Sequence, residues 1–142
     1  MKKIIYIAFI FLFSSQLISA QDNDDEKIKA LKISHITKAL DLSQKEAESF
    51  WPIYNQFEEK TDKLYEAKWC DVKNGIDLIE EIDEATAKTL IEQYVSLKKE
   101  SADLKGEFVE KLHQVISYKK ILMLKKAERD FHRILLEQYK KD

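Results

Sequence analysis

The sequence predicts an all-α protein, and three observations support this prediction. Apolar residues recur at intervals of three and four along most of the chain, as they do on one face of an α-helix. The 142 residues include only two glycines and one proline, so the turn residues that many short strands would need are scarce. Ser43 and Ser117 each precede a periodic stretch, as helix N-caps do. We therefore expect four helices in succession.

The N-terminus has the three parts of a secretory signal peptide. Lys2 and Lys3 precede an apolar run over residues 4–13, and the small residue Ala20 closes the segment. The alternative is a retained anchor helix, but the run has about half of the ~20 apolar residues that a membrane span requires. We therefore expect residues 1–20 to be cleaved and the mature chain to be exported without a membrane-spanning segment.

The charge balance argues against nucleic acid as a partner. The formal net charge is −2, and loss of Lys2 and Lys3 with the signal peptide leaves −4. Basic residues are concentrated at the C-terminal end, where residues 117–142 have a balance of +4, against −8 for residues 21–116. The basic end could form a positive face for an acidic partner, or it could be neutralised within the bundle.

One domain is expected after the signal peptide. Residues 21–25 predict a short, acidic, disordered lead-in, and residues 26–142 suffice for a single core. Cys70 is the one cysteine, so an internal disulfide cannot form. Its place near a predicted helix end favours a partly buried, inert thiol, with a disulfide-linked dimer as the alternative.

A strong start signal separates the first two helices. Periodic apolar residues predict a first helix over residues 26–40. Ser43 and Glu46 then form a capping box, in which the serine hydroxyl accepts from the N–H three residues on and the carboxylate accepts from the serine N–H. The second helix continues through about Trp69, and Pro52 inside it predicts a kink.

The second helix has an aromatic row, which consists of Phe50, Trp51, Tyr54 and Phe57. Spacings of three and four residues put these rings on one helical face. Rings of this size are costly to expose, so the row must be covered within the chain, by a second subunit or by a bound polypeptide. We single it out as a candidate surface for a client or for a dimer.

The clearest turn signal is Asn74-Gly75, and residues 76–81 then predict a short helical piece. Asp83 caps a long helix that is expected over about residues 84–116. Positions at alternating steps of four and three form a heptad seam along it: Leu90, Tyr94, Leu97, Ser101, Leu104, Phe108, Lys111 and Val115.

The length of this helix predicts an elongated molecule. About 32 residues at 1.5 Å each span roughly 48 Å, whereas a compact domain of this size would be about 35 Å across. We therefore expect a second subunit to cover part of the seam, in a homodimer. Gly106 within the helix costs about 1 kcal/mol relative to alanine and could allow another helix to approach closely.

Ser117 is expected to cap the last helix, which ends at about Tyr139. Lys120 stands where a capping box would have Glu or Gln, so only half of that motif is present. The apolar residues of this helix recur at helical spacing: Ile121, Leu124, Ala127, Phe131, Ile134 and Leu135.

Two segments together resemble a known family. They are L-D-L-S-x-x-E-A-x-x-F-W-P-I-Y-N, from Leu40, and I-S-x-K-K-I-L-x-L-x-K-A-E-x-D-F, from Ile116. Both are similar to the Spy/CpxP-like (LTxxQ) exported helical proteins of Gram-negative envelopes, in the branch labelled as sensors of extracytoplasmic-function sigma factors. Ser43 and Glu46 stand where the family has Thr and Gln, whereas Lys120 departs from the second motif.

The resemblance spans about residues 26–140 and implies a fold, a location and a function. The fold is a kinked four-helix protomer with a helical hairpin, paired in an antiparallel, cradle-like dimer in the periplasm. The function is either ATP-independent holdase binding of unfolded envelope proteins, or an accessory role toward a membrane sensor or anti-sigma protein, with metal or misfolded protein as the signal. A structural envelope dimer without either role is the third reading.

Metal and catalytic sites are weakly supported by the sequence. Glu110 and His113 form one Glu-x-x-His pair on a helix, and Glu128 with His132 lies one turn apart on another. A zinc site needs three or four converging ligands, so we expect surface ion pairing rather than a metal. No nucleophile motif is present, and we predict neither enzyme activity nor a cofactor.

Overall fold

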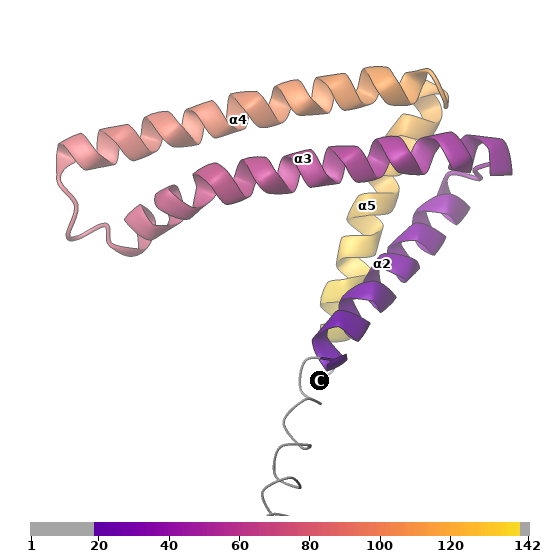
Figure 1. Cartoon of the computed structure of the whole chain (residues 1–142), viewed down its shortest axis with the longest axis horizontal. Coiled ribbons are helices and arrows are strands. Elements are labelled where there is room, and N and C mark those ends of the chain that lie inside the picture. Colours follow the sequence, from indigo (N-terminus) through magenta and orange to yellow (C-terminus); the bar gives the residue numbers. More distant parts are fainter. Residues whose placement is uncertain (1–18, 140–142) are drawn as a thin grey trace, which may run out of the picture. The chain divides into compact units, whose positions relative to one another are not determined.

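The structure is a computed structural model that describes residues 19–139, with the side chains of residues 24–138. Its four helices are α2 (Ser19–Ala39), α3 (Gln44–Asp77), α4 (Glu84–His113) and α5 (Tyr118–Tyr139) (Figure 1). No strand occurs within this described range, which confirms the all-α prediction. The antiparallel dimer and the elongated, cradle-like shape stay predictions, and the signal peptide falls almost entirely outside the described residues.

The chain divides into two compact units. One unit is formed by residues 41–125, which comprise α3, α4 and the first two turns of α5. The other unit combines α2 with the part of α5 that begins at Lys126. In this second unit His35 Nε2 lies 3.2 Å from the Ala127 carbonyl oxygen, and its ring lies 5.7 Å from that of Phe131.

Helix α2 begins earlier than predicted. It starts at Ser19, so it includes residues 21–25, which were expected to be disordered, rather than starting near residue 26. Acidic side chains are favourable in the first turns of a helix because they oppose the positive end of its dipole. Asp24 also pairs with Lys27 at 3.4 Å, one turn on. The lead-in composition is therefore compatible with helix.

Helix α3 begins where the sequence predicts. The Ser43 hydroxyl accepts from the Glu46 N–H at 3.2 Å, and the Glu46 carboxylate accepts from the Ser43 N–H at 2.9 Å, so the capping box is confirmed. The helix runs unbroken through Pro52, and a kink there stays a prediction.

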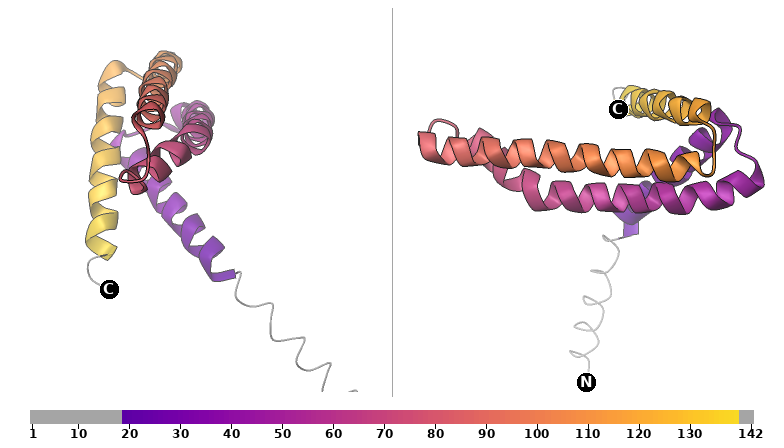
Figure 2. Two further views of the ribbon diagram at one scale, coloured as in Figure 1. Left: turned by 90° about the vertical axis from the view of Figure 1, so that its left-hand side faces the viewer. Right: turned by 90° about the horizontal axis from the view of Figure 1, so that it is seen from above.

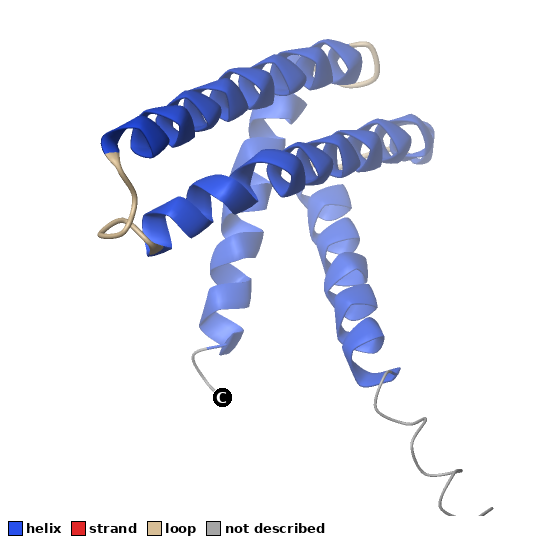
Figure 3. Ribbon diagram, turned by 60° about the vertical axis from the view of Figure 1, so that its left-hand side comes forward, coloured by secondary structure: helices blue, strands red, loops and turns tan. Residues whose placement is uncertain are grey.

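The end of α3 differs from the prediction. Asn74-Gly75 is not a turn, because α3 continues to Asp77 and the Leu78 N–H donates to the Asn74 carbonyl at 3.1 Å. Residues 76–81 do not form a separate helical piece either, since residues 78–83 form the connection to α4 (Figure 3).

The two glycines of the chain differ in their surroundings. A Cβ on Gly75 would lie 2.1 Å from Leu90 Cδ1, so the absent side chain allows α3 and α4 to approach closely. Around Gly106, by contrast, a Cβ would meet no atom of the described chain within 4 Å. Neither glycine has a positive φ. Within the described chain, close helix packing therefore occurs at Gly75, and approach of a second subunit at Gly106 stays a prediction.

Helices α3 and α4 run side by side as a helical hairpin (Figure 2). Asp83 caps α4 as predicted, since its carboxylate accepts from the Thr86 N–H at 2.8 Å. Leu97 and Phe108, both in the heptad seam, are buried, and the ring of Phe108 stacks on Phe57 of α3. At Phe108 the seam is therefore covered by α3 of the same chain.

Candidate functional site

The aromatic row lies in the core of the hairpin. Phe50 and Tyr54 are buried, with 0% and 2% of their surface exposed. Trp51 and Phe57 are half-buried. Phe57 stacks on Phe108 of α4 with ring centroids 4.1 Å apart, and Tyr54 meets the same ring edge-on at 6.0 Å.

The space beside the row is too small for a ligand. A gap lined by Phe57, Leu104 and Phe108 has a volume of about 10 Å³, roughly the room for one water molecule. The row therefore holds α3 against α4, and only Trp51 and Phe57 retain surface that could meet a dimer partner or a client.

A larger apolar surface lies at the opposite end of the hairpin, where α3 ends and α4 begins. It is a groove of about 320 Å³, which we call the hairpin-end groove. Ile79 and Ile91 in its wall are 58% and 62% exposed. The lining residues come from both helices and from the connection: Trp69, Val72, Gly75, Ile76, Ile79, Ile82, Ala87, Leu90, Ile91 and Tyr94.

Two contacts between α3 and α4 shape this groove. Gly75 allows the helices to approach closely at Leu90, and the rings of Trp69 and Tyr94 lie 6.2 Å apart. In the connection beyond these contacts, Ile79 is exposed and Ile82 is half-buried. The sequence predicts a short helical piece over residues 76–81, which would include Ile76 and Ile79. The signal for the groove was the repeat of isoleucine at positions 76, 79 and 82, around a turn.

Acidic residues predominate in the stretch of chain that forms the hairpin end. Residues 76–92 contain six acidic side chains and one lysine, a balance of −5. Asp83 is used as the α4 cap, and Glu92 pairs with Lys88 at 3.8 Å. Among the described residues, Glu80, Glu81 and Glu84 form no ion pair.

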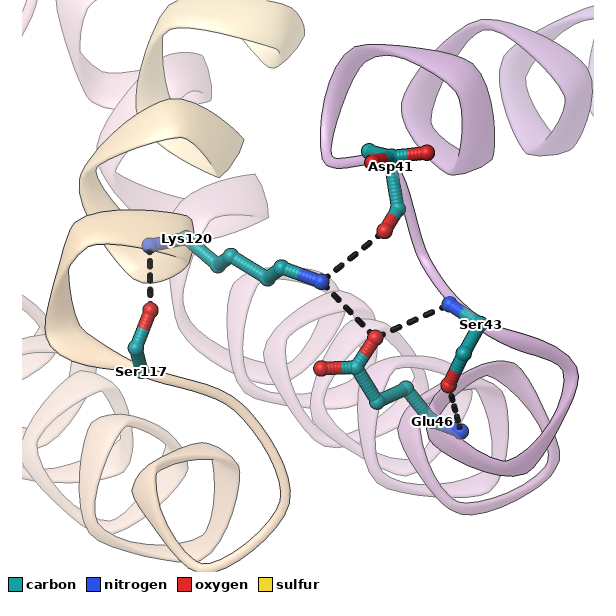
Figure 4. Close-up of polar contacts among 5 residues, drawn as sticks. All are labelled: Asp41, Ser43, Glu46, Ser117 and Lys120. Carbon is teal, nitrogen blue, oxygen red and sulfur yellow. Dashed lines mark hydrogen bonds and ion pairs between the residues drawn. The ribbon is translucent and has the colours of Figure 1, made fainter.

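A second polar arrangement surrounds the cap of α3 (Figure 4). The Lys120 ammonium, on the first turn of α5, donates to Glu46 Oε2 at 2.7 Å and to the Asp41 carbonyl at 2.9 Å. Asp41 has φ of 47°, in the left-handed region that Asp and Asn tolerate better than most residues. Ser117 accepts from the Lys120 N–H at 3.2 Å, which confirms it as the α5 cap.

Lys120 also changes the acidity of the capping carboxylate. The hydrogen bond from Lys120, followed by that from the Ser43 N–H, holds the pKa of Glu46 below its ordinary value of 4.5. Desolvation opposes this shift without reversing it. Lys120, which prevents a complete capping box at α5, therefore neutralises the carboxylate of the capping box at α3.

A polar cluster ties α3 to α4 between these two regions. Lys68 on α3 forms an ion pair with Glu100 on α4, and Ser96 donates to the same carboxylate oxygen at 2.9 Å. These partners, Lys68 first, lower the pKa of Glu100. The cluster therefore joins α3 to α4 through polar contacts.

The candidate metal residues form no complete site in the described structure. Glu110 and His113 lie on α4, and the His113 ring stacks on Tyr118 at 3.6 Å. Glu128 and His132 lie on the part of α5 that belongs to the other unit. No group of three or more His, Cys, Asp or Glu side chains suited to a metal occurs among the described residues.

The cysteine differs from the prediction. Cys70 is a free thiol and is exposed, whereas a partly buried one was expected. Helix α3 continues past it to Asp77, so Cys70 lies on the solvent-facing side of a helix rather than beneath a helix end.

None of the helices in the described range combines the length and apolar character needed to cross a membrane. Comparison with protein-family models, with curated proteins and with solved structures found no match to this chain.

Proposed function

We propose that this protein is an exported helical holdase that binds unfolded polypeptides without ATP, and that the hairpin-end groove is its binding surface. The observation that supports the proposal is the concentration of exposed isoleucines around a groove of about 320 Å³. Contiguous exposed apolar surface on a water-exposed protein is typical of sites that bind other proteins. The resemblance to Spy/CpxP-like proteins supports the same function.

The chemistry of the groove suits weak binding of many sequences. Its lining is almost entirely aliphatic and aromatic, so it offers few hydrogen-bonding groups that would select one side chain. Full burial of one large aliphatic side chain contributes about 1.5–3 kcal/mol, and association costs at least ~4 kcal/mol of lost freedom. A few buried side chains therefore give the low affinity that allows an unfolded client to leave and fold.

Export and dimerisation belong to the same proposal. Export is supported by the signal-peptide pattern of residues 1–20. The homodimer is supported by the family resemblance, while the heptad seam now has α3 as a partner at Phe108.

The proposal is tested by suppression of aggregation. Heat-unfolded citrate synthase scatters light as it aggregates, and the mature chain is expected to reduce this scattering without ATP. Ile91→Asp should lose most of the protection, because it places a charge in the apolar wall. Leu122→Asp is the matched control, since Leu122 on α5 is 72% exposed and does not line the groove.

Absence of protection at several-fold molar excess of the mature chain would contradict the holdase function. The accessory role toward a membrane sensor or anti-sigma protein would then take its place, and co-purification with such a protein would test it. Equal loss in both variants would show that the groove is not the binding surface.

A further inference from the structure

We propose that the hairpin-end groove selects apolar polypeptide segments that are flanked by Lys or Arg. This inference rests on the proposed holdase function and names the class of segment that the groove prefers. It depends on the charge around the groove, which the apolar lining alone does not predict.

The acidic side chains lie next to the lining residues in the chain. Asp77 follows Ile76, and Glu80 and Glu81 stand between Ile79 and Ile82. All three carboxylates are exposed. A segment whose apolar side chains enter the groove would therefore have its flanking residues close to these carboxylates.

These charges are available to a partner. Within the described chain, Glu80, Glu81 and Glu84 have no ion pair, whereas Lys88 already pairs with Glu92. A local excess of one charge sign beside an apolar surface raises the local concentration of oppositely charged segments and opposes those of like charge. Lys- or Arg-flanked segments therefore have the complementary charge.

The basic helix α5 of a second copy is a weaker candidate for the same groove. Lys120 already pairs with Glu46, and Lys126 pairs with Asp130 at 2.8 Å. Arg129 and Arg133 also lie 4.0 Å from Asp130. Four basic side chains of α5 thus already lie near a carboxylate of their own chain, three of them near Asp130 alone, so we assign the groove to a segment of another polypeptide.

The experiment uses three synthetic peptides with one apolar sequence and with Lys, Gln or Glu residues at both ends. The chain has two tryptophans, of which Trp69 lines the groove and Trp51 does not. In the full mature chain with Trp51→Phe, tryptophan emission therefore reports on the groove. Peptide binding is measured by the emission shift of Trp69 at low and at high salt.

We expect the Lys-flanked peptide to bind at least about tenfold more tightly than the Glu-flanked one at low salt. The difference should shrink at high salt, because exposed charges are screened. The Gln-flanked peptide should fall between them. Equal affinity of all three peptides would overturn the charge preference while leaving the holdase function intact.

Charge-reversal variants test whether the charge preference comes from the acidic residues beside the groove. Glu80→Lys with Glu81→Lys should favour the Glu-flanked peptide. Asp62→Lys with Glu66→Lys, two exposed positions on α3 outside the groove lining, is the control with the same change in net charge. An equal effect of both pairs would overturn the local assignment in favour of net charge.

The molecular mass in solution tests whether a second copy of the chain occupies the groove. Light scattering should give the same mass for the wild type and for Ile91→Asp, and both should have the same helical content by circular dichroism. A shift from dimer to monomer in Ile91→Asp, with helicity retained, would assign the groove to the dimer interface and overturn the proposal.

Discussion

Lys120 makes two polar contacts at the start of α3, one with a side chain and one with the backbone. Its ammonium neutralises Glu46, which caps α3, and it donates to the carbonyl of Asp41, whose φ is positive. A hydrogen bond between charged groups is stronger than one between neutral groups. Glu or Gln at position 120 would complete the α5 capping box but would lose both of these contacts.

Replacing Lys120 should therefore destabilise the fold. Lys120→Met keeps the aliphatic stem and removes the ammonium, and we expect Tm to fall by about 4 °C. Lys126→Met is the control. The Lys126 side chain, which pairs with Asp130, is 70% exposed, and exposed ion pairs contribute little to stability. Thermal unfolding followed by circular dichroism measures both. Equal shifts in the two variants would contradict the assigned role of Lys120.

The same contact predicts a dependence on pH. Because the folded pKa of Glu46 is below its ordinary value of 4.5, its stabilising effect is complete above that value and is lost as the pH falls through the lower, folded pKa. The Tm difference between wild type and Lys120→Met should therefore be largest at neutral pH. It should narrow below pH 4.5, and a constant difference down to pH 2 would contradict this cause.

At the scale of helices, the approach of α3 to α4 depends on one glycine. Gly75 is buried, and a Cβ there would overlap the end of the Leu90 side chain. Leu90 also lines the hairpin-end groove. A side chain at position 75 that displaces Leu90 would therefore disturb both the packing of the two helices and the groove.

Alanine at the two glycines should have different effects. Gly106→Ala is expected to raise the free energy of unfolding by about 0.5–1 kcal/mol, because the site has room and alanine favours helix. Gly75→Ala should not raise the free energy of unfolding, because the new methyl group would displace Leu90. It should also weaken peptide binding. Urea unfolding measures both, and an equal gain at the two positions would contradict the close approach at Gly75.

The sequence predicts features that depend on a few neighbouring residues. The caps at Ser43, Asp83 and Ser117 form as predicted, because each needs only a side-chain oxygen and an N–H three residues on. The turn predicted at Asn74-Gly75 does not form. Gly75 instead packs against Leu90, which is distant in sequence, so local turn preference was not decisive. The ion pair of Lys120 with Glu46 joins residues 74 positions apart, so no local pattern could reveal it.

The candidate site shows the same limit. The sequence predicts that an aromatic row at helical spacing is covered by other residues. Whether the cover is another helix of the chain or a partner depends on Phe108, which lies about 50 residues on and stacks against Phe57. The exposed isoleucines at the hairpin end could be recognised only once Ile76, Ile79 and Ile91 were seen to remain uncovered.

At the scale of the whole molecule, oligomeric state and client binding are separate properties. We expect the mature chain to be a homodimer, with twice the protomer mass in size-exclusion chromatography with light scattering at micromolar concentration. The Ile91→Asp variant should keep that mass, because the groove is assigned to clients. A monomeric wild type would contradict the dimer without affecting the groove.

We expect clients to contact the hairpin-end groove and not the aromatic row. Site-specific photo-cross-linking tests this expectation directly, with benzoylphenylalanine at position 91 or, as controls, at positions 57 and 122. With heat-unfolded citrate synthase, we expect a cross-link from position 91 and little or none from the other two. A cross-link from position 57 but not from position 91 would assign clients to the aromatic row and contradict binding in the groove.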